Sequence, residues 1–162
     1  MTVRPATVSD ASAIAEIYNY YIKTSHATFE ILEVSVDEMS RRIRETERGG
    51  YLFFVAGSDN EVNGYCCAHP WRPRAAYERT VEISVYVRHG HEAQGTASLL
   101  YEQLFEHMRA NDYHAVIAGI SLPNEASVRL HEKFGMKKVA HFNEVGRKFD
   151  RWVDVGYWEL VL

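Results

Sequence analysis

Residues 81–108 read VEISVYVRHGHEAQGTASLLYEQLFEHM. The first seven residues alternate strictly, which predicts a strand with one apolar face and a second face that carries Glu82, Ser84 and Tyr86. A polar loop follows, and from Ala97 onward apolar residues recur at the spacing of a helix that begins just after Gly95. A strand, a loop and a helix start in this order present unpaired backbone N–H groups that suit a phosphate or diphosphate. One glycine in such a loop is, by itself, more typical of an ordinary turn.

The segments on either side of this unit predict a single α/β domain that spans residues 1–162. No repeat, low-complexity tract or long linker divides the chain. A Ser-x-x-Glu sequence at residues 35–38 predicts the start of one helix. The predicted order of elements is βααβββαβαββ. The elements are a strand at 3–6, a helix that starts at 9–10, a helix at 35–49, strands at 51–57 and 62–69 joined by a turn at 58–61, the strand at 81–87, a helix at 97–108, a strand at 115–120, a helix at 124–134 and two final strands that end at Leu162.

The composition indicates a folded protein that does not bind polyanions. Of 162 residues, 46% are hydrophobic and 25% are charged, and the formal net charge is −4. Neither nucleic acid nor a membrane surface is therefore an expected partner. The first residues lack a signal-peptide pattern, and no apolar run is long enough to cross a bilayer. The adjacent Cys66 and Cys67 are poorly placed for a disulfide between them, which predicts a reduced, cytoplasmic setting.

Asn124, Ser127 and His131 fall on one stripe of the predicted helix at 124–134, and apolar residues occupy another stripe. One face of this helix can therefore pack while the other meets a ligand. A single helical histidine is also common as a surface or packing residue, so the pattern leaves both interpretations open.

Seven short stretches, in a fixed order, carry a resemblance to a known family. They are RPAT at 4–7, IYN at 17–19, ATFE at 27–30, RPRAAY at 72–77, EISVYV at 82–87, RLHE at 129–132 and EVGRKF at 144–149. Over nearly its whole length the chain resembles the GNAT acetyltransferase superfamily and, within it, the phosphinothricin and methionine sulfoximine N-acetyltransferases. The resemblance implies an α/β fold whose twisted mixed β-sheet is splayed between two central parallel strands, with helices on both faces. It also implies that acetyl-CoA, as co-substrate, binds in that splay.

The diphosphate loop of the superfamily, Gln/Arg-x-x-Gly-x-Gly/Ala, corresponds to residues 92–97 of this chain. Glu92 departs from its first position. Because an acid beside a diphosphate is electrostatically unfavourable, we expect either weaker affinity for CoA or a Glu92 side chain that turns away. Small residues let the backbone N–H groups approach the diphosphate. The residues that the resemblance assigns to acetyl-CoA are Val85, Val87, Gln94, Gly95, Thr96, Ala97, Ser98, Asn124 and Ser127.

The resemblance assigns catalysis to Glu82 and His131. Acetyl transfer needs a base for the substrate amine and a proton donor for the departing thiolate. Glu82 corresponds to the base of the family, although the alternation alone fits a solvated strand residue equally well. A carboxylate needs burial or a bridging water for this role. His131 stands where many members have a tyrosine, and its reference pKa of about 6.5 suits a proton donor.

The arginine-rich loop before residue 81 is expected to recognise an amino-acid-like acceptor such as phosphinothricin, methionine sulfoximine or methionine sulfone. The guanidinium groups of Arg72 and Arg74 match carboxylate or phosphinate oxygens two at a time, although an exposed basic loop has the same composition. The resemblance adds Phe29 and Glu30 to this pocket, and Lys148 from a dimer mate. It thus implies a homodimer. Three aromatic residues fit either the dimer interface or the core: Trp152, Tyr157 and Trp158.

No metal site is predicted. His89, His91 and Glu92 are three donors within one short loop, which cannot easily surround an ion. Two alternative functions stay open. The acceptor can be a peptide N-terminus or another small amine, and the chain can be a CoA-binding sensor without turnover.

Overall fold

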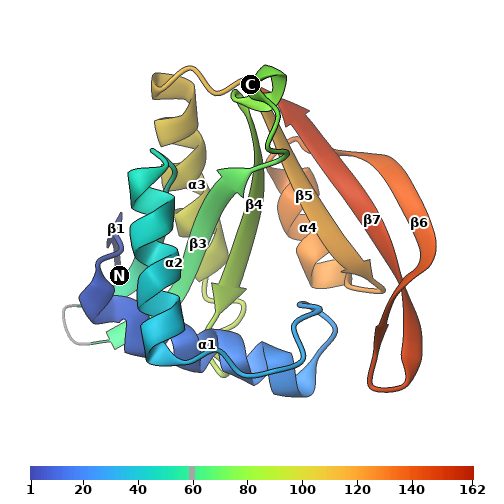
Figure 1. The fold of residues 1–162 in the computed structure, drawn as a ribbon, viewed down its shortest axis with the longest axis horizontal. Helices are drawn as coiled ribbons and strands as arrows, with labels where there is room; N and C mark the ends of the chain where they lie inside the picture. Colours follow the sequence, from blue (N-terminus) through green and yellow to red (C-terminus); the bar gives the residue numbers. More distant parts are fainter. Residues whose placement is uncertain (59–60) are drawn as a thin grey trace.

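A computed structural model describes residues 1–58 and 61–162 of the chain. Within these residues seven strands form one mixed sheet in the order β1-β2-β3-β4-β5-β7-β6 (Figure 1). The predicted order of helices and strands is confirmed, with additional short 3₁₀ helices at Val8–Asp10 and Ala75–Tyr77. Asp59 and Asn60, in the predicted turn at 58–61, lie outside the described residues. The strands are β1 (Thr2–Pro5), β2 (Phe53–Ser58), β3 (Glu61–Pro70), β4 (Thr80–Val87), β5 (Ala115–Leu122), β6 (Lys137–Lys148) and β7 (Arg151–Val161), and the α-helices are α1 (Ala11–Thr24), α2 (Val36–Arg48), α3 (Thr96–Ala110) and α4 (Glu125–Lys133).

The two central strands, β4 and β5, are parallel neighbours that separate part-way along their length. Three residue pairs join them, and the last is Glu82 with Ile117. Beyond this point β4 stays paired with β3 as far as Val87, and β5 stays paired with β7 as far as Leu122. Each half of the sheet therefore keeps its own partners while the halves diverge (Figure 1). This divergence is the splay that the family resemblance implied.

Helices cover both faces of the sheet (Figure 1). One apolar core lies between α3 and the sheet and includes Leu100 and Phe105. A second core lies between α1, α2 and the other face, and it includes Ile14 and Ile43. Because side chains alternate along a strand, each face of the sheet supplies apolar side chains to one of the two cores. Burying one large apolar side chain stabilises the folded state by about 1.5–3 kcal/mol. Among the described residues, no helix combines the length and apolar character needed to span a bilayer.

Gly64 lets the start of α3 approach β3 closely. A Cβ at this position would lie 2.9 Å from Thr96 Cγ2 and 3.0 Å from the Tyr86 carbonyl oxygen. A side chain at this position would therefore force the Thr96 side chain, and to a smaller extent the Tyr86 carbonyl, to shift. The glycine on β3 therefore determines how closely the N-terminus of α3 approaches the splayed strand β4.

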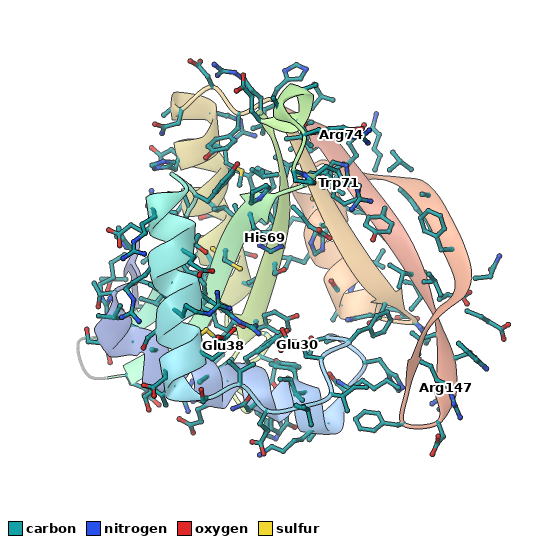
Figure 2. All side chains as sticks on the ribbon, viewed as in Figure 1. Glu30, Glu38, His69, Trp71, Arg74 and Arg147 are labelled. Carbon is teal, nitrogen blue, oxygen red and sulfur yellow. The ribbon has the colours of Figure 1, made fainter. Side chains whose placement is uncertain are left out.

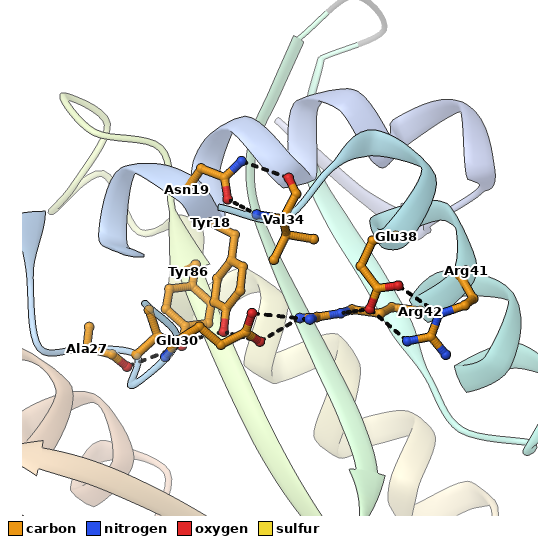
Figure 3. A network of polar contacts seen from close by, with 10 residues as sticks. Tyr18, Asn19, Ala27, Glu30, Val34, Glu38, Arg41, Arg42 and Tyr86 are labelled. Carbon is orange, nitrogen blue, oxygen red and sulfur yellow. Dashed lines mark hydrogen bonds and ion pairs between the residues drawn. The ribbon is translucent and has the colours of Figure 1, made fainter. Parts of the chain in front are cut away.

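The segment between α1 and α2, residues 25–35, is fastened to the sheet and to α1 (Figure 3). The Asn19 side chain donates to the Val34 carbonyl at 2.9 Å and accepts from the Val34 N–H at 2.8 Å. The Tyr86 hydroxyl donates to the Ala27 carbonyl at 3.2 Å. These bonds hold a segment without regular structure in one position beside the splay.

Candidate active site

A groove of about 570 Å³ lies between the separated ends of β4 and β5. Residues 83–87 of β4 form one wall and residues 119–121 of β5 the other, while the start of α3 and one face of α4 close it. Of the residues that the sequence assigned to acetyl-CoA, Gln94 does not line the groove and is exposed on the preceding loop. The others all line it: Val85, Val87, Gly95, Thr96, Ala97, Ser98, Asn124 and Ser127.

The start of α3 presents free backbone donors to this groove. Gly95 adopts a left-handed conformation with a φ of 84°, which glycine reaches without the steric penalty of a Cβ. The first helical bond runs from the Leu99 N–H to the Gly95 carbonyl, so the N–H groups of residues 96–98 have no acceptor within the helix. No side chain of the described chain caps this helix. The donors and the helix dipole together suit a diphosphate.

Glu92, which departs from the diphosphate-loop pattern, is held by its own loop. Its carboxylate accepts the Gly90 N–H at 2.7 Å and lies 3.2 Å from His89 Nδ1. Hydrogen bonds from backbone N–H groups, its own first and then that of Gly90, lower the pKa of Glu92. Hydrogen bonds within the loop therefore partly compensate the negative charge of Glu92, although Glu92 still lines the groove.

His131 is buried on α4, and both of its ring nitrogens have hydrogen-bond partners. Nδ1 lies 2.7 Å from the Ser127 carbonyl oxygen, which can only accept, so Nδ1 carries the proton. Nε2 therefore accepts the hydroxyl proton of Tyr101, at 2.9 Å. Burial lowers the pKa of His131, which favours a neutral ring at neutral pH. Both side chains line the groove, and the O–H proton of the pair belongs to Tyr101.

The polar stripe predicted on α4 faces the groove. The Asn124 side-chain oxygen accepts the Ser127 N–H at 3.2 Å and so caps the start of the helix. The Ser127 hydroxyl lies 3.4 Å from His131 Nδ1. The cap fixes the first turn of α4, which in turn places the backbone carbonyl that holds His131.

A second cavity of about 610 Å³ opens on the sheet face that carries Glu82. Arg72 and Phe29, two of the residues expected to bind the acceptor, also line it. β7 contributes Val155 and Tyr157, and the outer wall comes from β6. The cavity thus joins a carboxylate, a guanidinium and several apolar side chains.

The two cavities meet beside Glu82. Ala27, Gly119 and Ser121 line both of them. A Cβ on Gly119 would lie 3.4 Å from Glu82 Oε1. The absence of a side chain at Gly119 therefore keeps open the passage between the groove and the carboxylate.

The charge state of Glu82 depends on burial and on Arg72. Burial raises the pKa of Glu82, and the positive charge of Arg72 opposes this rise. Arg72 stacks over the Trp71 ring at 4.2 Å, and Trp71 contacts Tyr157 edge to face at 5.6 Å. Burial raises the pKa of Tyr157, and the Glu82 charge adds to the rise. A carboxylate with a raised pKa is a better proton acceptor than a solvated one.

Arg74 lies outside this cavity. Its guanidinium is exposed and lies 5.7 Å from the Tyr77 ring centroid (Figure 2). Both arginines are exposed, but of the two only Arg72 lines the second cavity, so the pair that the sequence suggested is divided between two surroundings.

Glu30 is adjacent to Phe29 but faces another way. Arg42 donates to both of its carboxylate oxygens, at 2.7 and 3.2 Å, and the Tyr18 hydroxyl donates at 3.1 Å (Figure 3). Glu30 lines a third cavity, beneath α2. Its charge is therefore used to fasten residues 25–35 to α2.

Lys148 is buried within its own chain. Its Nζ donates to the Thr28 carbonyl at 2.8 Å and to the Tyr21 carbonyl at 3.5 Å, and burial lowers its pKa. It therefore holds the segment that lines both cavities, and it does not line the second cavity of the chain described here.

Sequence reasoning missed three residues of the site. Tyr101 was counted with the apolar stripe of α3, although it is the member of that stripe with a hydroxyl group. Gly119 lies inside a strand, a position that often marks a close approach of another group. For Tyr157 the sequence fits the core and the dimer interface equally well. Trp158 is in the core at 2% exposure, and Trp152 is exposed at 61%.

Histidine and carboxylate side chains do not converge on a metal-binding arrangement in residues 1–58 and 61–162. His89 contacts Glu92 at 3.2 Å, whereas His91 lies 4.0 Å from Glu61 on β3. The donors of this loop thus face different neighbours.

Comparison with known proteins identifies the family of this fold and site. The family model described as the acetyltransferase (GNAT) domain matches residues 3–156. The chain belongs to the GNAT acetyltransferase family. This acetyltransferase is 40% identical over 162 residues to the phosphinothricin N-acetyltransferase of Streptomyces coelicolor, with 97% of this chain and 94% of that protein covered. It is 34% identical to the L-methionine sulfoximine/L-methionine sulfone acetyltransferase of Salmonella typhimurium, with coverage of 100% and 95%.

A solved structure of a related enzyme contains acetyl-CoA. The GNAT superfamily phosphinothricin acetyltransferase from Sinorhizobium meliloti, solved in complex with acetyl-CoA, matches with a TM-score of 0.96 and 30% identity, over 99% of this chain and 88% of that chain. This acetyltransferase is therefore an acetyl-CoA-dependent N-acetyltransferase related to the phosphinothricin and methionine sulfoximine enzymes.

Proposed function

We propose that the enzyme transfers the acetyl group of acetyl-CoA to the amino group of a small amino-acid-like acceptor, of the phosphinothricin, methionine sulfoximine or methionine sulfone type. The transfer is direct, within a ternary complex. The observation that carries this proposal is the position of Glu82. Its carboxylate lies where the groove between the splayed strands meets a second cavity that contains a guanidinium group.

Glu82 is the base for the acceptor. An amino acid in the second cavity presents its ammonium group to Glu82 and its carboxylate to Arg72. Burial raises the pKa of Glu82, which brings it closer to the range in which a carboxylate takes a proton from an amine, directly or through a water. Phe29 forms an apolar part of the wall.

The oxyanion of the transition state is held by the backbone of β4. Beyond Glu82 the β4 strand has no partner on the β5 side. Those of its N–H groups that face β5, near Val85 and Val87, are free to donate to the thioester oxygen.

The proton for the departing thiolate comes from the Tyr101 and His131 pair. His131 alone is a poor donor in this arrangement, because burial lowers its pKa and its Nε2 accepts a hydrogen bond. The Tyr101 hydroxyl, held at 2.9 Å by Nε2, carries the proton of the pair; because burial raises the pKa of Tyr101 well above its usual value, the hydroxyl gives up this proton only as negative charge develops on the sulfur beside it. Solvent restores that proton after CoA leaves.

The proposed active form is a homodimer. The exposed aromatic side chains of the C-terminal hairpin support it, since Phe142 and Trp152 are 51% and 61% exposed. Sedimentation of the purified protein tests this part of the proposal.

Thiol release from acetyl-CoA tests the function. Adding methionine sulfone should release free CoA, whereas its carboxyl amide should be a poor acceptor. Arg72→Ala should lower kcat/KM for the free acid by about ten- to hundredfold, and the matched Arg74→Ala should lower it less, because Arg74 lies outside the cavity. If peptides with free N-termini outcompete all amino acids, the acceptor class is wrong. If acetyl-CoA binds and no acceptor releases thiol, the protein is a sensor.

A further inference from the structure

A third cavity, of about 570 Å³, lies between α2 and the sheet face that carries Glu82. We call it the α2 trough. Pockets of roughly 300–1,000 Å³ typically hold small ligands. Its ends lie near His69 and Glu30, and Figure 2 shows both residues, with Trp71 above them, along this face of the sheet. Ser84 and Tyr86 of β4 line both this cavity and the groove, and none of the acceptor contacts proposed above uses this space.

The register of β3 and β4 connects the trough to the catalytic carboxylate. His69 pairs with Glu82, and in the next row on the same face Cys67 pairs with Ser84. One row further, Tyr65 pairs with Tyr86. Cys67 and Ser84 have small side chains, whereas the residue pairs on both sides of them have large ones. Two small side chains therefore form a floor that begins directly beside Glu82.

One wall of the trough is apolar and buried, whereas other lining residues, among them Glu45 and His69, are polar and exposed. Met39, Tyr65 and Tyr18 line it with 2%, 3% and 9% exposure. By contrast, the outer wall of the second cavity is open, since Val139 and Phe142 are 54% and 51% exposed. An apolar group of a ligand is removed from water more completely in the trough.

The trough has no free cation for an acidic ligand. Arg42 is the one arginine or lysine among the described residues that line it. Its guanidinium donates to Glu30 at 2.7 Å and to Glu38 at 2.9 Å. Glu45 adds a second carboxylate to the lining beside Glu30, and Arg41, which does not line the trough, forms an ion pair with it. Burial raises the pKa of Cys67 to about 12, so its thiol is neutral. A phosphinate or carboxylate would meet like charges here.

We infer that the α2 trough holds the side chain of the acceptor amino acid, and that this side chain is uncharged: a thioether, sulfone, aliphatic or aromatic group. The inference rests on the proposed function. With the amine at Glu82 and the carboxylate at Arg72, the side chain continues over Cys67 and Ser84 into the trough. Phosphinothricin, whose side chain is anionic, is then a poorer acceptor than methionine sulfone.

Filling the floor tests where the side chain lies. Cys67→Phe should lower kcat/KM for methionine as acceptor by at least about tenfold. For alanine as acceptor, whose side chain is too short to reach the floor, kcat/KM should change by less than about threefold. Acetyl-CoA binding in the variant, followed by calorimetry, shows that the fold is intact. Val139→Phe adds similar bulk to the second cavity and should affect both acceptors alike.

A charge reversal tests which side chains the trough accepts. Glu45→Lys should raise kcat/KM for phosphinothricin relative to methionine sulfone by about fivefold, as expected for a partly screened unit charge. Glu47→Lys makes the same change on α2 outside the trough and should leave the ratio unchanged.

These experiments can refute the placement of the side chain without refuting the proposed acetyl transfer. The trough does not hold the side chain if Cys67→Phe lowers kcat/KM for methionine and for alanine equally, or if Val139→Phe lowers kcat/KM for methionine alone. The same conclusion follows if Glu47→Lys changes the ratio of kcat/KM for phosphinothricin and methionine sulfone as much as Glu45→Lys does. In each of these cases the proposed acetyl transfer still stands. If the wild-type enzyme acetylates no amino acid, both the function and the inference are wrong.

Discussion

Replacing Gly119 by alanine should slow the enzyme strongly without unfolding it. The new Cβ would lie 3.4 Å from Glu82 Oε1 and 3.2 Å from Tyr157 Cε1. The φ of Gly119 is not in the left-handed region, so alanine can adopt the backbone conformation. The methyl group would thus occupy the passage where the groove meets the second cavity.

The expected effects on stability and on turnover differ in size. Alanine in place of glycine restricts the unfolded chain and stabilises a protein by about 0.4–1 kcal/mol, and the tight contact with the Tyr157 ring offsets part of this gain. The free energy of unfolding should therefore change by less than about 1 kcal/mol. A misplacement of about 1 Å in reacting groups lowers rates by about a hundredfold, so kcat should fall ten- to hundredfold.

Three measurements check this prediction. Urea denaturation gives the stability, calorimetry gives the affinity for acetyl-CoA, and thiol release gives kcat. A double-mutant cycle with Glu82→Gln adds a mechanistic control, because two changes that act on one transition state should not be additive. A Gly119→Ala enzyme with kcat within twofold of wild type would refute the view that acetyl group and amine meet at this junction.

Further predictions concern the base, the proton donor and the segment that lines the cavities. Glu82→Gln should lower kcat/KM by about a hundredfold or more. In the wild type kcat/KM should rise with pH through the raised pKa of Glu82, because only the carboxylate accepts a proton; the Gln variant should lack this limb. Tyr101→Phe should lower kcat by about ten- to hundredfold with little change in acceptor KM, and nitrogen NMR of the wild type should show a neutral His131 with its proton on Nδ1 at pH 7. Lys148→Met should lower the free energy of unfolding by about 1–3 kcal/mol, because the Thr28 carbonyl loses a buried donor. It should also raise KM for the acceptor more than for acetyl-CoA, and equal changes in both values would argue against this placement.

The backbone part of the site could be predicted from the sequence. Strict alternation placed Glu82 on the face opposite Val81, and the structure confirms that arrangement, with Val81 in the core beneath α3. The helix start at Gly95 was equally visible, because a glycine before an apolar periodic segment marks a helix boundary. Both signals are local, so they need no knowledge of distant contacts.

Contacts between distant segments could not be predicted in the same way. Alternation gives the face of a side chain but not its partner, so neither the ion pair of Glu30 with Arg42 nor the burial of Lys148 followed from the sequence. β6 was predicted only as one of two final strands, since register shifts between Lys138 and Ala140 and beyond Phe142 break its alternation. The sequence predicted Tyr101 only as a core residue, because its ring lies at the helical spacing of the apolar residues of α3.

The bond from Lys148 to the Thr28 carbonyl joins residues 120 positions apart in the chain. The groove takes its lining from residues no later than His131, whereas the second cavity also needs β6 and β7. Because closing so long a loop is entropically unfavourable and slow, the docking of the C-terminal hairpin on residues 26–29 is expected to be a late event in folding. During synthesis on the ribosome, the residues that line the groove are made before β6 and β7, but β5, one wall of the groove, gains its antiparallel partner only when β7 pairs with it, so both cavities are expected to reach their final form together.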